Sequence, residues 1–148
     1  MTLTEKLFAY AGDFEKTFVD DDWSRLEPHF TEDVVYEVVN CPFACRVEGR
    51  DAVFAAMRKS ISGFDRRCDA RRLGVRSGPT ESADQVELDW EVTYSLKGAP
   101  DFLLLGGSLA RFRGDRICYL RDSYPDGMGE QITAWTGKYT PDWDLSYV

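Results

Sequence analysis

The chain has 148 residues, enough for one domain with a sizeable core, and 43% of them are hydrophobic and 14% aromatic. Its net charge of −8 argues against nucleic-acid and anionic-membrane partners, which bind basic surfaces. No apolar run reaches the ~18–20 residues of a membrane span, and no basic segment precedes an apolar one at the N-terminus. We therefore expect one cytoplasmic domain, residues 1–148.

Three helices are predicted in the first half of the chain. The capping-box pair Thr2 and Glu5 begins a helix at residues 3–19, whose apolar face repeats at helical spacing (Leu7, Ala11, Phe14 and Phe18). A short second helix ends near residue 30, and a third spans about residues 50–62. His29 lies beside the apolar face of the second helix, where it either packs against the backbone or donates into a pocket.

Strands dominate the remainder, and they are expected at residues 33–39, 66–76, 86–97, 102–113 and 116–124. Residues 40–47 are predicted to be a loop and residues 78–84 a polar turn. The five arginines between residues 66 and 76 indicate a solvated edge strand, with an anion-binding patch as the alternative. The pair Gly106-Gly107 predicts a bulge or a sharp bend within its strand.

The last strand carries one acid near its end, Asp122. Strand alternation puts this acid on one face with Cys118, Leu120 and Tyr124. An apolar cavity would raise the pKa of the carboxyl group and prepare it as a general base. The alternatives are a salt bridge to Arg121 or another arginine, and plain exposure to water.

The cysteine and histidine content makes a zinc site improbable. There are four cysteines without a Cys-x-x-Cys pair, and His29 is the only histidine. Cys41 and Cys45 form either a disulfide across three residues or two free thiols, and a cytoplasmic setting favours the thiols. We expect neither a metal nor another cofactor.

Helices followed by strands predict an α+β fold. We expect a cone in which about three N-terminal helices pack on a curved, mostly antiparallel sheet and enclose an apolar pocket. The tail from Gly127 contains a short predicted helix, residues 130–135, and several aromatic residues. This tail either covers the mouth of the cavity or packs on a partner.

Several motifs together resemble the nuclear transport factor 2-like superfamily, and its SnoaL-like and ketosteroid-isomerase-like branches in particular. These motifs are Asp21-Asp22-Trp23, Leu26, Phe30, Glu32-Asp33-Val34 and Glu48-Gly49-Arg50-Asp51-Ala52-Val53. The resemblance covers nearly the whole chain and implies the cone fold. It leaves function open, because the superfamily includes isomerases, cyclases, dehydratases, hydrolases and binding proteins.

The family's catalytic residues carry over only in part. The ketosteroid isomerase base, tyrosine and protonated acid fall at Val38, Phe14 and near Ser108, so that mechanism is not expected. The scytalone-dehydratase-like branch uses a site with two histidines, whereas this chain has one histidine, so that chemistry is not expected either. The SnoaL-like cyclase motif resembles residues 121–126 with one residue inserted, which places Asp122 on the base; the cyclase histidine has no counterpart at residues 109–110.

Three hypotheses for function follow. In the first, an isomerase, cyclase or dehydratase uses Asp122 as general base, with Tyr36, Tyr94 or His29 donating to the developing oxyanion. Its substrate-binding walls are Phe14, Phe18, Val38, Trp90, Tyr94 and Phe112. In the second, the same pocket binds a small hydrophobic molecule without turnover. In the third, the chain is an interaction module, and a homodimer through the exposed face of the sheet is expected.

Overall fold

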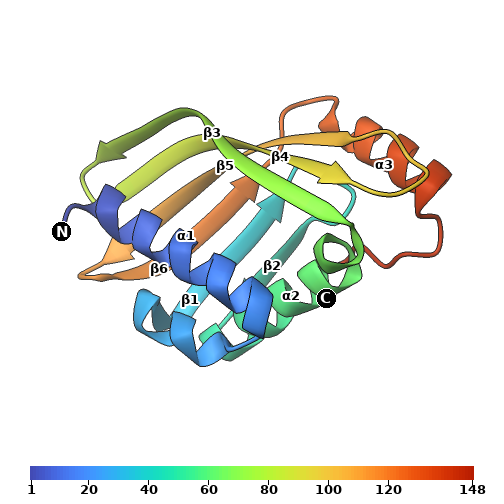
Figure 1. Ribbon diagram of the computed structural model, residues 1–148. Helices are drawn as coiled ribbons and strands as arrows, with labels where there is room; N and C mark the ends of the chain where they lie inside the picture. Colours follow the sequence, from blue (N-terminus) through green and yellow to red (C-terminus); the bar gives the residue numbers. More distant parts are fainter.

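A computed structural model describes residues 1–148, and it has helices on one side of a six-stranded sheet (Figure 1). The strand order is β2-β1-β6-β5-β4-β3, and every neighbouring pair is antiparallel except β1 with β6. The strands are β1 (Phe30–Val39), β2 (Cys45–Glu48), β3 (Ala70–Ser82), β4 (Gln85–Ser95), β5 (Phe102–Arg113) and β6 (Arg116–Ser123). The helices are α1 (Leu3–Asp20), η1 (Trp23–His29), α2 (Arg50–Gly63), η2 (Asp65–Arg67) and α3 (Met128–Tyr139).

The predicted N-terminal helices are confirmed. The hydroxyl of Thr2 accepts a hydrogen bond from the backbone N–H of Glu5 at 3.1 Å and caps α1. The second predicted helix, η1, is a 3₁₀-helix, which suits a short segment with Pro28 inside it. None of the helices is both long and apolar enough to cross a membrane.

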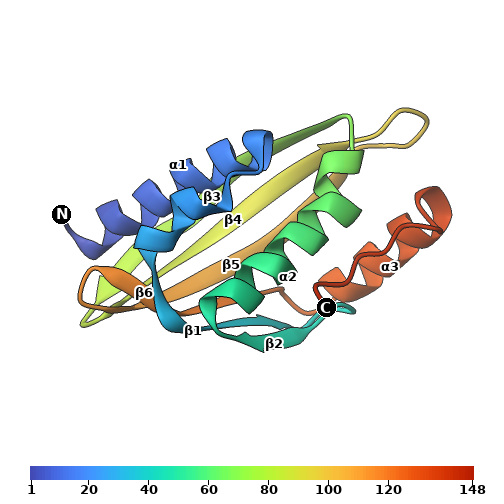
Figure 2. The ribbon, with the colours of Figure 1, turned by 90° about the horizontal axis from the view of Figure 1, so that it is seen from below.

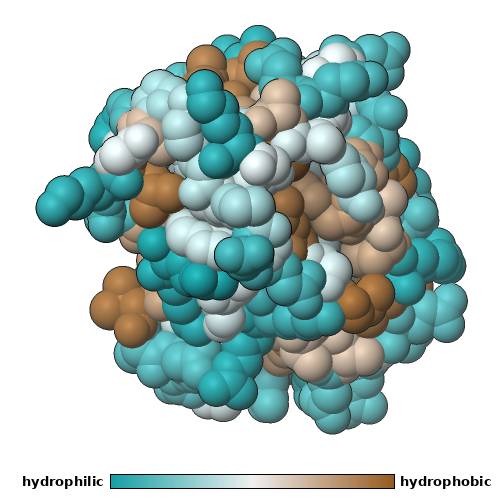
Figure 3. Space-filling view, turned by 90° about the vertical axis from the view of Figure 1, so that its right-hand side faces the viewer, coloured by the Kyte–Doolittle hydropathy of each residue, from teal (hydrophilic) through white to brown (hydrophobic).

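The sheet is curved, and α1, η1 and α2 cover its concave side (Figures 1 and 2). The core lies between these layers, where Leu26, Phe30, Val34 and Val53 have no exposed surface. The helix α3 packs at one end of the molecule, beside β5. At this end the surface is hydrophilic, with hydrophobic groups between the polar ones (Figure 3). The predicted α+β architecture with a curved, mostly antiparallel sheet is therefore confirmed.

Two expected loops contain strand. The segment 40–47, predicted as a loop, ends in β2, which pairs with β1. This strand escapes pattern analysis because it is short and only Val47 is buried. The segment 78–84, predicted as a turn, is mostly the end of β3, which pairs with β4 as far as Ser82. Its side chains are exposed, so the ladder of backbone hydrogen bonds, rather than a buried face, holds this edge.

The prediction that Cys118 shares a face of β6 with Leu120 and Asp122 is wrong. A register shift between β5 and β6 leaves Cys118 as an extra residue, because Arg111 pairs with Tyr119 and Phe112 with Ile117. Ile117 rather than Cys118 is therefore buried. At Gly106-Gly107, by contrast, a bulge was predicted and none is present, because both glycines stay in register with β4. All four cysteines are free thiols.

Candidate functional site

A cavity of about 520 Å³ lies between α1, α2 and the concave face of the sheet, and 18 of its 26 lining residues are hydrophobic. The exposed side chains among them belong to α1 and β3: Phe8 is 43% exposed, Leu73 53% and Val75 51%. These three residues form what we call the apolar rim.

The carboxylate of Asp122, from the end of β6, faces the cavity. The hydroxyl of Tyr36 donates to its Oδ2 at 2.6 Å, and the hydroxyl of Ser108 donates to its Oδ1 at 2.6 Å. The indole N–H of Trp90 donates in turn to the Ser108 oxygen at 2.8 Å. Four neighbouring strands (β1, β6, β5 and β4) thus supply the carboxyl group and the neutral donors that fix it.

The place of Trp90 depends on Gly106, its partner across the strand pair. A Cβ atom at residue 106 would overlap the indole ring, closer than any real contact. The missing side chain therefore lets the ring lie against the sheet with its N–H directed at Ser108. This close approach, rather than a bulge, explains the glycine inside β5.

Burial raises the pKa of Asp122, although the hydrogen bonds from Ser108 and Tyr36 partly oppose the shift. The carboxylate is enclosed by protein but keeps some accessible surface, because that surface belongs to the cavity wall. Its negative charge also helps to raise the pKa of four tyrosines (Tyr10, Tyr36, Tyr124 and Tyr147), after the larger effect of their own burial. Those four phenols therefore stay protonated at neutral pH and can donate a hydrogen bond.

A second acid, Asp65, lines the same cavity beside a guanidinium. Arg71 donates through Nε to Asp65 at 3.2 Å and through both terminal nitrogens to Glu15 at 2.7 and 3.0 Å. The hydroxyl of Tyr94 donates to the same oxygen of Asp65 at 3.0 Å. Burial raises the pKa of Asp65, while the charge of Arg71 opposes the shift. This acid is thus one member of a compensated ion-pair network joining α1, η2 and β3.

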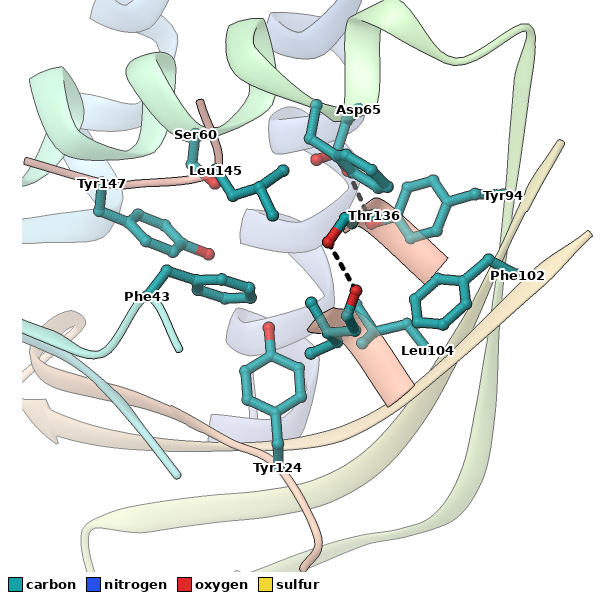
Figure 4. Close-up of a pocket in the computed structure, with 12 residues that line it drawn as sticks. Phe43, Ser60, Asp65, Tyr94, Phe102, Leu104, Tyr124, Thr136, Leu145 and Tyr147 are labelled. Atoms are coloured by element: carbon teal, nitrogen blue, oxygen red, sulfur yellow. Dashed lines mark hydrogen bonds between the residues drawn. The ribbon is translucent and has the colours of Figure 1, made fainter. Parts of the chain in front are cut away.

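The C-terminal tail completes the cavity wall. A side pocket has a volume of about 50 Å³. Leu145 and Tyr147 of the tail point into it (Figure 4). The side pocket shares Tyr94, Tyr124 and Tyr147 with the larger cavity, so the two adjoin. The ring of Tyr147 lies 5.7 Å from that of Tyr36. The tail was predicted either to cover the cavity or to pack on a partner, and its residues lie at the cavity.

Five of the predicted site residues line the cavity, namely Phe14, Tyr36, Trp90, Tyr94 and Asp122. Four others do not. His29 bonds to the carboxylate of Asp13 at 2.7 Å and does not line the cavity, which corrects the predicted alternative of a donor into a pocket. Val38 and Phe112 are core residues, 1% and 6% exposed. Phe18 stacks under the Arg71 guanidinium at 4.2 Å, one turn beyond the cavity-lining part of α1.

Sequence analysis missed the polar partners. Ser108 lies directly opposite Asp122 in the β5–β6 ladder, but a regular hairpin register counted from Arg113 and Arg116 would have paired it with Arg121. The extra residue at Cys118 makes the difference, and the sequence pattern does not show it. The link between Arg71 and Asp65 has no sequence signal either, because it joins an edge strand to a helix end. No group of three or more histidine, cysteine or acidic residues is placed to hold a metal ion.

The model of the SnoaL-like domain matches residues 12–120 of the sequence. The chain belongs to the SnoaL-like family. No protein of curated function matches it. The predicted membership of the nuclear transport factor 2-like superfamily, SnoaL-like branch, is thereby confirmed.

Solved structures of the same fold are similar over most of the SnoaL-like chain. A nuclear transport factor 2-like protein from Anabaena variabilis has a TM-score of 0.68 and 14% identity, covering 87% of this chain and 97% of its own. A putative polyketide cyclase from Pseudomonas putida has a TM-score of 0.58 and 22% identity, covering 88% and 98%. A ketosteroid isomerase-like protein from Catenulispora acidiphila, in complex with trimethylamine, has a TM-score of 0.62 and 17% identity, covering 86% and 92%. At these identities the likeness shows the fold alone.

Proposed function

We propose that this SnoaL-like protein binds a small hydrophobic or aromatic molecule in its cavity and that Asp122 acts on it as a general base. The observation that carries the proposal is the carboxyl group of Asp122 at the cavity wall, held by Tyr36 and Ser108 and without a cationic partner. Burial that raises its pKa brings a carboxylate closer to the range in which it accepts a proton effectively.

The geometry favours removal of a proton next to a carbonyl group. Tyr36 and Ser108 already donate to the carboxylate, so they hold its orientation rather than stabilise a product oxyanion. The remaining phenols near the acid, Tyr124 and Tyr147, line the same cavity and keep their protons at neutral pH. They are the candidate donors to an enolate, whose charge develops in the transition state. The reaction class is therefore an isomerisation, cyclisation or elimination that begins with an enolate.

The experiment uses 2-tetralone, a neutral ketone with a benzylic α-position that is small enough for the cavity. Exchange of its α-hydrogens in D₂O is followed by NMR with the wild-type protein and with Asp122→Asn. A general base of this kind contributes roughly 10²–10⁴-fold, so the wild type should accelerate exchange and the variant should lose that acceleration. Equal rates with both proteins would remove the base from the proposal.

The second candidate is a binding protein without turnover. The absence of the ketosteroid isomerase and cyclase partner residues at Val38, Phe14 and residues 109–110 favours it. The relative from Catenulispora acidiphila holds a small molecule, trimethylamine, and this chain would likewise hold a ligand in its cavity. Binding of 2-tetralone or another small ligand without isotope exchange would support this candidate.

A further inference from the structure

The charges that line the cavity are unequal. Among its lining residues are three carboxylates, those of Glu15, Asp65 and Asp122, and one cationic group, that of Arg71. The guanidinium is already paired with two of these acids, since Glu15 accepts from both terminal nitrogens and Asp65 accepts from Nε. An anionic ligand would therefore find no free cation in the cavity and would meet an excess of negative charge.

The two acids near the centre of the cavity differ in what surrounds them. Asp65 has a counter-ion in Arg71. Asp122 accepts hydrogen bonds from two hydroxyl groups but forms no ion pair with any side chain. Enclosing a carboxylate without a counter-ion costs desolvation free energy, and a bound cation would offset that cost.

Aromatic rings surround the same carboxylate. Tyr36 bonds to it, and the rings of Tyr36 and Tyr147 lie 5.7 Å apart. The rings of Trp90, on β4, and Tyr124, which follows β6, lie 5.9 Å apart and perpendicular. Faces of electron-rich rings attract ammonium groups, most strongly where water is excluded. A carboxylate with rings on several sides is the arrangement that binds alkylated ammonium ions.

We propose that the cavity binds a small organic ammonium ion, with its nitrogen beside Asp122 and its apolar group directed toward the apolar rim (Phe8, Leu73 and Val75). The inference rests on the ligand-binding part of the proposed function and is independent of the general-base step. It narrows the ligand from any small hydrophobic molecule to a hydrophobic cation that fits within about 520 Å³.

The test compares two molecules of the same shape. Benzyltrimethylammonium carries the charge, and neopentylbenzene replaces its nitrogen by carbon. Each is titrated by NMR into the wild type, into Asp122→Asn and into Asp13→Asn, whose carboxylate lies outside the cavity. We expect the wild type and Asp13→Asn to bind the cation at least about tenfold more tightly than the neutral molecule. Asp122→Asn should bring that ratio close to one.

A second variant keeps the inference testable if Asp122→Asn does not fold. Tyr147→Leu removes a ring of the tail but keeps an apolar side chain, and it should weaken cation binding by about threefold or more while leaving the neutral molecule unaffected. Neutral binding equal to or tighter than cation binding in the wild type would overturn the inference. So would an unchanged ratio in a folded Asp122→Asn.

The outcomes separate this inference from the proposed function. Isotope exchange in 2-tetralone without preference for the cation would leave the general base standing and remove the ammonium ligand. Preference for the cation without exchange would leave the ligand class standing and remove the base. Failure of both probes to bind the wild type would remove both.

Discussion

Asp65 and Asp122 are two acids in one cavity, and their surroundings give them different tasks. Burial raises the pKa of both. Asp65 is compensated by Arg71, which also binds Glu15 and so ties α1 to the edge of the sheet. Asp122 is held only by neutral donors. A buried acid with a counter-ion is compensated within the fold and is costly to uncouple, whereas one without a counter-ion is available to a ligand.

The largest effect is expected at the compensated acid. Arg71→Met would leave Glu15 and Asp65 without their cation while Asp65 stays buried. Breaking a buried ion pair costs about 3–5 kcal/mol, so urea unfolding at pH 7 should show a loss of that order. Arg72→Met is the matched control on the same strand. Its side chain is 62% exposed, and a change within about 0.5 kcal/mol is expected. A loss below about 1 kcal/mol for Arg71→Met would mean that the network does not hold α1.

Asp122→Asn should increase the free energy of unfolding relative to the wild type, whereas Arg71→Met decreases it. The folded protein holds the Asp122 proton more tightly than the unfolded chain does, since burial raises its pKa. Wild-type stability therefore falls as pH rises from about 4, the unfolded value, through the folded pKa, and the penalty is complete above it. The asparagine variant lacks this penalty, so its stability relative to the wild type should increase across that window.

Asp13→Asn provides a control of opposite sign for this pH series. The hydrogen bond from His29 lowers the pKa of Asp13, so the wild type gains stability as pH rises toward the unfolded value. The Asp13→Asn variant should lose relative stability over that lower range. If the relative stabilities of the two variants changed with pH in the same direction, the proposed burial of Asp122 without a counter-ion would be wrong.

A smaller effect is expected from removing single donors. Tyr36→Phe takes away one of the two hydrogen bonds to Asp122, and since that bond lowers the pKa, the pKa should rise further. Tyr94→Phe takes away a bond to Asp65, but Arg71 remains on the same oxygen, so the pKa of Asp65 should rise less than that of Asp122. Each change should cost about 1 kcal/mol in unfolding free energy. Carboxyl-carbon NMR measures both pKa values, and a greater rise at Asp65 would reverse the assignment.

The smallest effect is expected at His29, which bonds to Asp13 away from the cavity. His29→Gln should leave the affinity for benzyltrimethylammonium within about twofold of the wild type, since it moves no lining group. Its effect on stability at pH 8 should stay below about 1 kcal/mol, as for other partly exposed pairs. A large loss of affinity in His29→Gln would mean that His29 contributes to ligand binding.

The sequence predicted the elements that have a regular apolar face. The helix α1 and the strand β4 follow their patterns closely, because one face of each is buried. The edge segment β2 has a single buried residue and the end of β3 has none, so their pairing is visible only in three dimensions. The bulge at Cys118 is also local geometry that alternation cannot show.

The candidate site was predictable at its walls and at Asp122 but not in its charge balance. Tyr36 and Trp90 were expected at the cavity because they alternate with exposed residues on strands. The guanidinium of Arg71 belonged to a run of arginines that suggested a solvated edge, and its neighbours on β3 are indeed exposed. Only the fold brings Glu15 and Asp65, from two helical segments, to opposite sides of one guanidinium.

The contact between Gly106 and Trp90 has a consequence for how ligand selectivity can change in proteins like this one. Any side chain at residue 106 would displace the indole ring, and the freed or filled space would alter the largest molecule the cavity admits. The same displacement would remove the N–H that orients Ser108, and with it one of the two donors to the carboxylate. Size selection and the strength of the acid are therefore coupled through a residue that has no side chain. A single substitution there cannot adjust one without the other, whereas substitutions at the apolar rim can.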